Sequence, residues 1–205
     1  MTPPAPVPTI EVWFEFGSNY SYLAALRIEA LAHEAGVAVL WRPFLLGQIF
    51  RELGWSSSPF VLQGVKGRYM WRDMEREAAK YGLPWRRPSA FPRTALLPMR
   101  VATLGAHAPW IGEFCRRVMA QNWVEDRAID DPAPALEALS GLVADPDAVL
   151  AAALGADNKL RLRANTASAA ARGIFGAPTF FVGDEMFWGN DRLDDAIALA
   201  AGPRA

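Results

Sequence analysis

The chain has 205 residues, of which 52% are hydrophobic and 21% charged, and its formal net charge is −1. This is an ordinary globular composition, long enough to bury a core, and neither its charge nor its motifs indicate nucleic-acid binding. The single cysteine, Cys115, excludes an intrachain disulfide and a CxxC redox pair.

The N-terminal stretch "MTPPAPVPT" is rich in proline, and we expect residues 1–8 to form a flexible tail. It lacks the basic start and the apolar core of a signal peptide. No run in the chain approaches the roughly 20 apolar residues that cross a membrane. We therefore expect a cytoplasmic protein that does not insert into membranes.

A βαβ unit is predicted next. "IEVWFEF" (10–16) alternates and carries β-branched and aromatic side chains, which favours a strand. Residues 19–35 place apolar side chains three and four apart, which predicts a helix, and "VAVLWRPF" (37–44) predicts a second strand. The short loops between these elements imply parallel strands joined by a right-handed crossover.

Between about Leu45 and Arg172 the patterns predict helices and no strand. Two of the helices begin with Asp followed by Pro, which is typical of a helix cap and first turn. The predicted helices are "GRYMWRDMEREAAKYG" and residues 94–106, 109–124, 132–143, 146–154 and 157–172.

Strand signals return in "PTFFVG" and "EMFWG", which flank the tight-turn sequence "GDE", and a last helix is predicted from about Asp191 to Ala201. The order βαβ, helices, ββα is the thioredoxin arrangement. We therefore predict an α/β chain with a thioredoxin-like fold and a large all-helical insertion. The expected domains are a discontinuous thioredoxin-like domain (9–45 and 173–205) and an inserted helical domain (46–172).

Five stretches together resemble the 2-hydroxychromene-2-carboxylate isomerases, glutathione-dependent relatives of the kappa-class glutathione transferases: "WFEFGSNYSYLA", "WRPFLLGQIF", "KGRYMWRDM", "GIFGAPTFFVG" and "MFWGNDRLDD". The resemblance covers nearly the whole chain from Ile10 onward. It implies glutathione as the cofactor, a small aromatic substrate and a possible homodimer. The implied reaction interconverts 2-hydroxychromene-2-carboxylate and trans-o-hydroxybenzylidenepyruvate by transient addition of the glutathione thiolate.

Ser18 is the predicted catalytic residue, because it stands at the strand-to-helix turn where redox relatives carry their attacking cysteine. A hydroxyl there can donate a hydrogen bond to a thiolate, and the unpaired N–H groups of a helix start lower the pKa of a thiol. The alternative is that Ser18 is only a helix cap.

The predicted glutathione-binding residues lie near the C-terminus. The resemblance implies a cis-proline at Pro178, with the main chain of Ala177 free to pair with the cysteinyl unit of glutathione. It also implies that Asn190 and Asp191 hold the γ-glutamyl group. A rigid turn before a strand and a simple helix cap are the respective alternatives.

Other residues carry weaker signals. Asn19 and Trp55 depart from the family pattern, which has proline and, in kappa-class relatives, asparagine at these places. Lys66 and Arg68 can meet an acidic group or face solvent, and Cys115 is expected to be a packing residue. His33 and His107 stand 74 positions apart without other ligands, so we predict no metal site.

Two alternative functions remain open. A kappa-like glutathione transferase or peroxidase would share every glutathione-binding residue. A non-catalytic thioredoxin-like module would use the cis-proline edge to bind a peptide. A dithiol oxidoreductase is disfavoured, because it needs a cysteine at the turn that Ser18 occupies.

Overall fold

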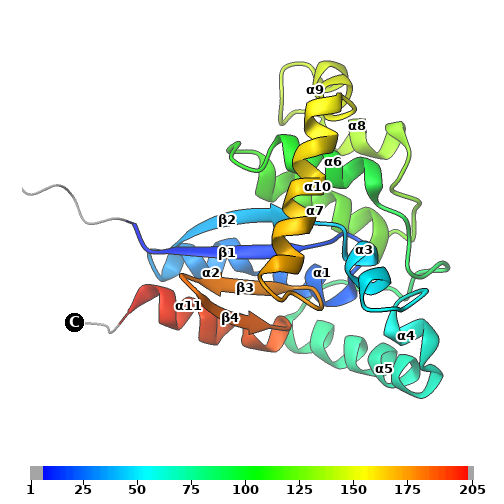
Figure 1. Ribbon diagram of the computed structural model, residues 1–205, viewed down its shortest axis with the longest axis vertical. Coiled ribbons are helices and arrows are strands. Elements are labelled where there is room, and N and C mark those ends of the chain that lie inside the picture. The colour runs from blue at the N-terminus through cyan, green and yellow to red at the C-terminus, as the bar shows by residue number, and fades with distance from the viewer. Residues whose placement is uncertain (1–6, 203–205) are drawn as a thin grey trace, which may run out of the picture.

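The computed structural model describes residues 7–202, so the predicted tail of residues 1–8 lies outside them apart from Val7 and Pro8. The strands form one sheet in the order β2-β1-β3-β4. β1 runs parallel to β2 and antiparallel to β3, which is antiparallel to β4 (Figure 1). Their bounds are β1 (Thr9–Phe14), β2 (Ala38–Pro43), β3 (Thr179–Val182) and β4 (Glu185–Trp188). This topology confirms the predicted thioredoxin-like fold.

Helices cover both faces of the sheet because the side chains of β1 alternate between the two faces. Ile10, Val12 and Phe14 belong to the larger buried cluster, whereas Trp13 belongs to a smaller one with Phe44. The helices beside the larger cluster are α1 (Asn19–Ala25), α2 (Ile28–Glu34) and α11 (Leu193–Ala201). The helices beside the smaller cluster are α3 (Leu46–Glu52) and α10 (Ala156–Ala171).

The remaining helices lie in the segment between β2 and β3. The α6–α9 group gathers at the β2 side of the molecule, whereas α4 and α5 lie at its other side (Figure 1), where α5 contacts α1. The large buried cluster extends from the sheet into α5–α9. The prediction that residues 46–172 form a separate inserted domain stays a prediction. The bounds are α4 (Pro59–Leu62), α5 (Gly64–Tyr81), α6 (Leu96–Leu104), α7 (Ile111–Trp123), α8 (Pro132–Leu139) and α9 (Pro146–Ala153).

The single helix predicted over residues 19–35 is wrong, because the chain turns at Leu26 and Arg27 and forms α1 and α2 instead. The Arg27 N–H bonds the Ala24 carbonyl three residues back, while the Arg27 side chain takes the Leu23 carbonyl at 3.3 Å. In a continuous α-helix the Leu23 carbonyl would accept the Arg27 backbone N–H, but here it accepts from the Arg27 side chain. The backbone therefore forms a tighter turn at this point.

Gly67 allows α4 and α5 to approach closely, because a Cβ at this position would overlap the carbonyl oxygen of Phe60. We expect Gly67→Ala to lower the free energy of unfolding by about 1–3 kcal/mol, the usual cost of overpacking. Gly47, in α3, has open space where a Cβ would lie. As the matched control, Gly47→Ala should be neutral or stabilising by about 0.5–1 kcal/mol. Urea unfolding of both variants tests this; equal effects would contradict the close approach.

Candidate functional site

Ser18 connects two segments that are distant in sequence. It caps α1 with extended backbone (φ −87°, ψ 117°), and its Oγ accepts the Ser21 N–H at 3.2 Å. The Ser18 hydroxyl donates to the Ala177 carbonyl at 2.9 Å, across 159 positions of the sequence. The residue is 7% exposed. Ser18 is therefore a helix cap that also contacts the loop before β3.

The loop before β3 is held in place on several sides. The Ala177–Pro178 peptide bond is cis, and the Pro178 carbonyl accepts the Gly189 N–H at 3.0 Å. Thr179 Oγ1 donates to the Gly176 carbonyl at 2.9 Å. The Trp188 indole packs on Gly176, where a Cβ would overlap it. The Ala177 main chain is thus fixed, and its carbonyl is already occupied by Ser18 rather than free.

Asn190 is a buried residue of the short 3₁₀ helix η1 (Asn190–Arg192), which precedes α11 and contacts α1. Its Oδ1 accepts from the Arg27 guanidinium at 3.0 Å, and its Nδ2 lies 3.4 Å from the Tyr81 hydroxyl oxygen. The same guanidinium stacks on the Tyr81 ring, 3.6 Å from its centroid. The Asn190 side chain thus secures η1 against α2 and α5.

Asp191 is exposed, and its carboxylate pairs with Arg192 at 3.3 Å. The last α-helix begins at Leu193 rather than at Asp191, and its first turn carries Asp194 and Asp195. Two carboxylates at that turn disfavour a ligand carboxylate there. The geometry therefore favours Asp191 as an acceptor for an ammonium group over a helix start that binds an anion.

The residues that brace the turn before Ser18 were not predicted from the sequence. Asn122 Nδ2 and Trp123 Nε1, both from α7, donate to the Phe16 carbonyl at 3.0 Å each. Glu15 Oε2 accepts the Gly17 N–H at 3.1 Å. The signal that could have revealed Glu15 is a carboxylate in the apolar stretch "WFEFG", directly before the turn.

Burial raises the pKa of Glu15 to about 7; the Gly17 hydrogen bond opposes this rise, and the nearby Asp130 carboxylate adds to it. Asp130 is half-buried, and its Oδ1 accepts the Leu97 N–H at 2.7 Å. Glu15 is thus a carboxyl group that changes charge near neutral pH, three positions before Ser18.

Asn19 and Ser21 are buried polar residues of α1, 2% and 0% exposed. Within residues 7–202, neither Asn19 Nδ2 nor Ser21 Oγ has a hydrogen-bond partner. Tyr20 lies between them in sequence, and its hydroxyl donates to Asp73 of α5 at 2.7 Å. Burial, reinforced by this bond to Asp73, raises the pKa of Tyr20. The first turn of α1 is therefore tied to α5 through Tyr20, and nothing in the structure explains Asn19.

Lys66 approaches the first turn of α1 through aromatic side chains. Its Nζ lies 5.8 Å from the centroid of Phe60, whose ring lies 6.1 Å from that of Tyr20. Lys66 also lines an open hollow of about 470 Å³ at the start of α5, together with Gln63, Gly64, Val65 and Tyr69. Trp55 follows α3, packs on Phe50 and is 38% exposed.

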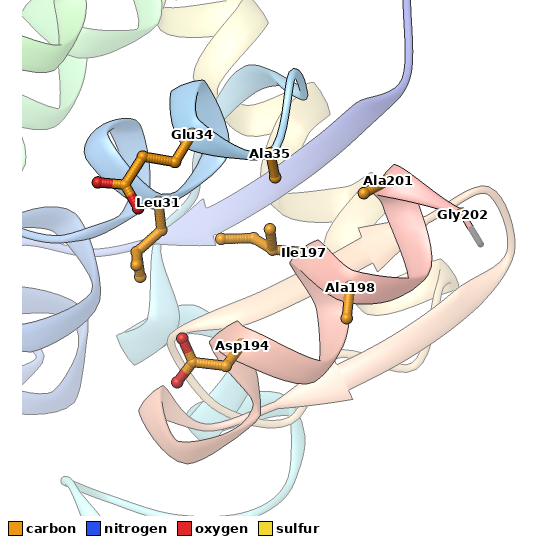
Figure 2. Close-up of a pocket in the computed structure, with 8 residues that line it drawn as sticks. All are labelled: Leu31, Glu34, Ala35, Asp194, Ile197, Ala198, Ala201 and Gly202. Atoms are coloured by element: carbon orange, nitrogen blue, oxygen red, sulfur yellow. The ribbon is translucent and has the colours of Figure 1, made fainter. Parts of the chain in front are cut away.

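A separate pocket of about 380 Å³ lies between α2 and α11 (Figure 2). Its lining includes Leu31, Glu34, Asp194 and Ile197, and none of the predicted site residues.

Cys115 is fully buried, and burial raises its pKa well above the usual range. Across residues 7–202, no three His, Cys, Asp or Glu side chains are grouped so that they could ligate a metal, and every helix is too short or too polar to cross a membrane.

Comparison with known proteins gives matches along nearly the whole chain. Residues 9–198 match the model of the DSBA-like thioredoxin domain. A 2-hydroxychromene-2-carboxylate isomerase of Sphingobium xenophagum is 34% identical over 91% of this chain and 94% of its own length. Glutathione S-transferase kappa 2 of Caenorhabditis elegans is 24% identical over 95% of this chain and 92% of its own length. A solved 2-hydroxychromene-2-carboxylate isomerase, at 27% identity, superposes with a TM-score of 0.81 over 90% of each chain. The resemblance seen in the motifs is confirmed.

Proposed function

Because the chain belongs to the DSBA-like thioredoxin domain family and to the 2-hydroxychromene-2-carboxylate isomerase family, we propose that it is a glutathione-dependent isomerase of this type. It acts on a small aromatic substrate in the cytoplasm. The observation that carries the proposal is the Ser18–Ala177 hydrogen bond, which brings the predicted catalytic hydroxyl to the predicted peptide-binding edge.

The Ser18 hydroxyl has one hydrogen to donate, and the Ala177 carbonyl receives it in the structure. A neutral hydrogen bond contributes about 0.5–1.5 kcal/mol, whereas a bond to a charged group contributes about 1.5–3 kcal/mol. Donation to a thiolate is therefore favoured over donation to Ala177. Turning the hydroxyl toward a bound thiolate also releases the Ala177 carbonyl.

The residues around Ser18 fit the groups of glutathione. The released Ala177 carbonyl can accept an N–H from the cysteinyl unit, and the exposed Asp191 carboxylate can accept from the γ-glutamyl ammonium. Asn190 acts indirectly, because its side chain is held by Arg27 and fixes the position of η1. Pro178 anchors the same loop, because its carbonyl accepts the Gly189 N–H at 3.0 Å.

When bound, glutathione would supply the thiolate for reversible addition to the substrate double bond. The Ser18 hydroxyl stabilises the thiolate and orients it. Lys66 and the exposed aromatic side chain of Tyr69, which line the same hollow, supply charge and apolar surface for an aromatic carboxylate. No group of this chain is consumed.

The second candidate function is a kappa-like glutathione transferase. It is favoured by the similarity to glutathione S-transferase kappa 2 of Caenorhabditis elegans along nearly the whole chain. This function would use the same Ser18 and Ala177 contacts. It would differ in the substrate, which would retain the glutathione sulfur instead of releasing it.

Calorimetric titration of the full chain with glutathione tests what both enzyme functions share, and we expect binding. Turnover of 2-hydroxychromene-2-carboxylate that requires glutathione without consuming it supports the isomerase. Consumption of glutathione with a halogenated aromatic acceptor, and no turnover of the chromene, would support the transferase. No binding in the titration would reject both enzymes and favour a peptide-binding module.

The same purified chain, analysed by sedimentation, tests the predicted homodimer.

A further inference from the structure

We propose that Glu15 is a positioning residue for Ser18, because the turn that presents the Ser18 hydroxyl is built on the main chain and the side chain of Glu15. The inference rests on the proposed role of Ser18 in holding the glutathione sulfur.

Glu15 contacts the turn at two successive N–H groups. Its carbonyl oxygen accepts the Ser18 N–H at 3.1 Å, and its Oε2 accepts the Gly17 N–H at 3.1 Å. The main chain and the side chain of Glu15 therefore both accept N–H groups from the turn between β1 and α1. The Glu15 side chain therefore contacts Gly17 directly and acts on Ser18 through the main chain.

The turn has little room to adopt another shape. A Cβ on Gly17 would lie 2.9 Å from the Arg93 carbonyl oxygen and 3.0 Å from Glu15 Oε2. On its other side, the Phe16 carbonyl is held by Asn122 and Trp123. Packing and neutral hydrogen bonds hold the other contacts of this turn. The contact between the Glu15 side chain and the Gly17 N–H differs from them, because its strength depends on the charge of Glu15.

The charge of Glu15 decides how strongly it holds Gly17. An ionised carboxylate accepts an N–H more strongly than a neutral carboxyl group does. The charged groups that face it include Asp130, which disfavours ionisation. The Arg93 guanidinium, from the segment before α6, is engaged with Asn122 and Asp126 instead. Because burial raises the pKa of Glu15 to about 7, we expect the turn to be held more tightly above this pH than below it.

Glu15→Gln, which keeps the shape and removes the charge, tests the proposal, with Glu11→Gln as the matched control. Glu11 lies four positions earlier, in β1. Burial alone would raise its pKa, but hydrogen bonds from Trp13, Arg172 and Arg42 lower it. Its contacts do not include the turn, so Glu11→Gln should leave the pH profile unchanged.

Three measurements on the full chain are needed. The first follows the Gly17 amide resonance against pH, and we expect a midpoint near 7 in the wild type and none in Glu15→Gln. The second follows binding of S-methylglutathione against pH, because this probe has no thiol proton of its own. The third is kcat/KM of the isomerisation, which should fall about tenfold in Glu15→Gln above pH 8 and little below pH 6.

Unfolding provides a check with a definite sign. The folded pKa of Glu15 lies above that of an unfolded glutamate, so the folded state binds more protons between about pH 4.5 and 7. Glu15 therefore lowers the stability of the wild type as the pH rises through this range. Glu15→Gln should lose this contribution, whereas Glu11→Gln should retain it.

The outcomes separate cleanly. A uniform fall in kcat/KM at all pH values, or a Gly17 amide that titrates equally in Glu15→Gln, would overturn the positioning role. If Glu15→Gln does not fold, Glu15→Asp replaces it: its carboxylate is one methylene shorter and should lose the Gly17 contact, so a Gly17 titration and a kcat/KM profile unchanged from the wild type in Glu15→Asp would overturn the role as well. A wild type that does not bind glutathione or S-methylglutathione would reject the proposed function itself, which is a different failure.

Discussion

Replacing Ser18 with alanine should lower kcat/KM of the glutathione-dependent isomerisation by about 10- to 100-fold. In the proposed mechanism the interaction lost is a hydrogen bond to a charged sulfur, about 1.5–3 kcal/mol, and each 1.4 kcal/mol corresponds to a factor of ten. The thiol of bound glutathione should also ionise at higher pH in Ser18→Ala, because its anion loses a donor. Ultraviolet absorbance of the thiolate, followed against pH in the bound state, measures this shift directly.

Ser21→Ala is the matched control, because Ser21 lies in the same helix and its buried hydroxyl has no partner among residues 7–202. Removing such a group should leave the activity intact and be neutral or favourable for stability. Ser18→Ala additionally loses the cap of α1, which costs about 1 kcal/mol. Unfolding curves separate this cost from the catalytic loss. Equal thiol titration in the wild type and Ser18→Ala would show that the hydroxyl only caps the helix.

The parts of the site that the sequence predicted are those with a local signature. Ser18 lies in the turn that follows the first strand, and Pro178 directly precedes the third, so the antiparallel pairing of these two strands brings both to the same end of the sheet. The confirmed fold depends on the same alternation and turn signals. These are properties of neighbours in sequence, and a sequence pattern can encode them.

The parts that the sequence did not predict depend on contacts between distant side chains. The break at Arg27 arises where its side chain reaches the Leu23 carbonyl and Asn190, 163 positions away. The partnered state of the Ala177 carbonyl and the role of Asn190 likewise follow from tertiary hydrogen bonds. The raised pKa of Glu15 depends on burial in the folded chain and on Asp130, 115 positions away in sequence. The spacing of apolar residues along the sequence does not reveal these contacts between distant side chains.

Replacing Ser18 with cysteine should change the chemistry of the chain rather than weaken it. The introduced thiolate would stand where the Ser21 N–H stabilises it, and such a thiolate attacks disulfides. With oxidised glutathione, its sulfur forms a bond to one glutathione sulfur, the original disulfide breaks, and a glutathione thiolate leaves. Intact-mass measurement should find one bound glutathione per chain in Ser18→Cys.

The wild type supplies the first control, because its single cysteine, Cys115, is fully buried and burial keeps its thiol protonated. It should remain unmodified under the same conditions. Ser21→Cys supplies the second, since a sulfur at that fully buried position in the same helix has no access to the disulfide. Selective modification of Ser18→Cys would mean that this position is both reachable by glutathione and able to support its anion. Both properties are required of Ser18 as the holder of the glutathione sulfur, and an unmodified Ser18→Cys variant would contradict that role.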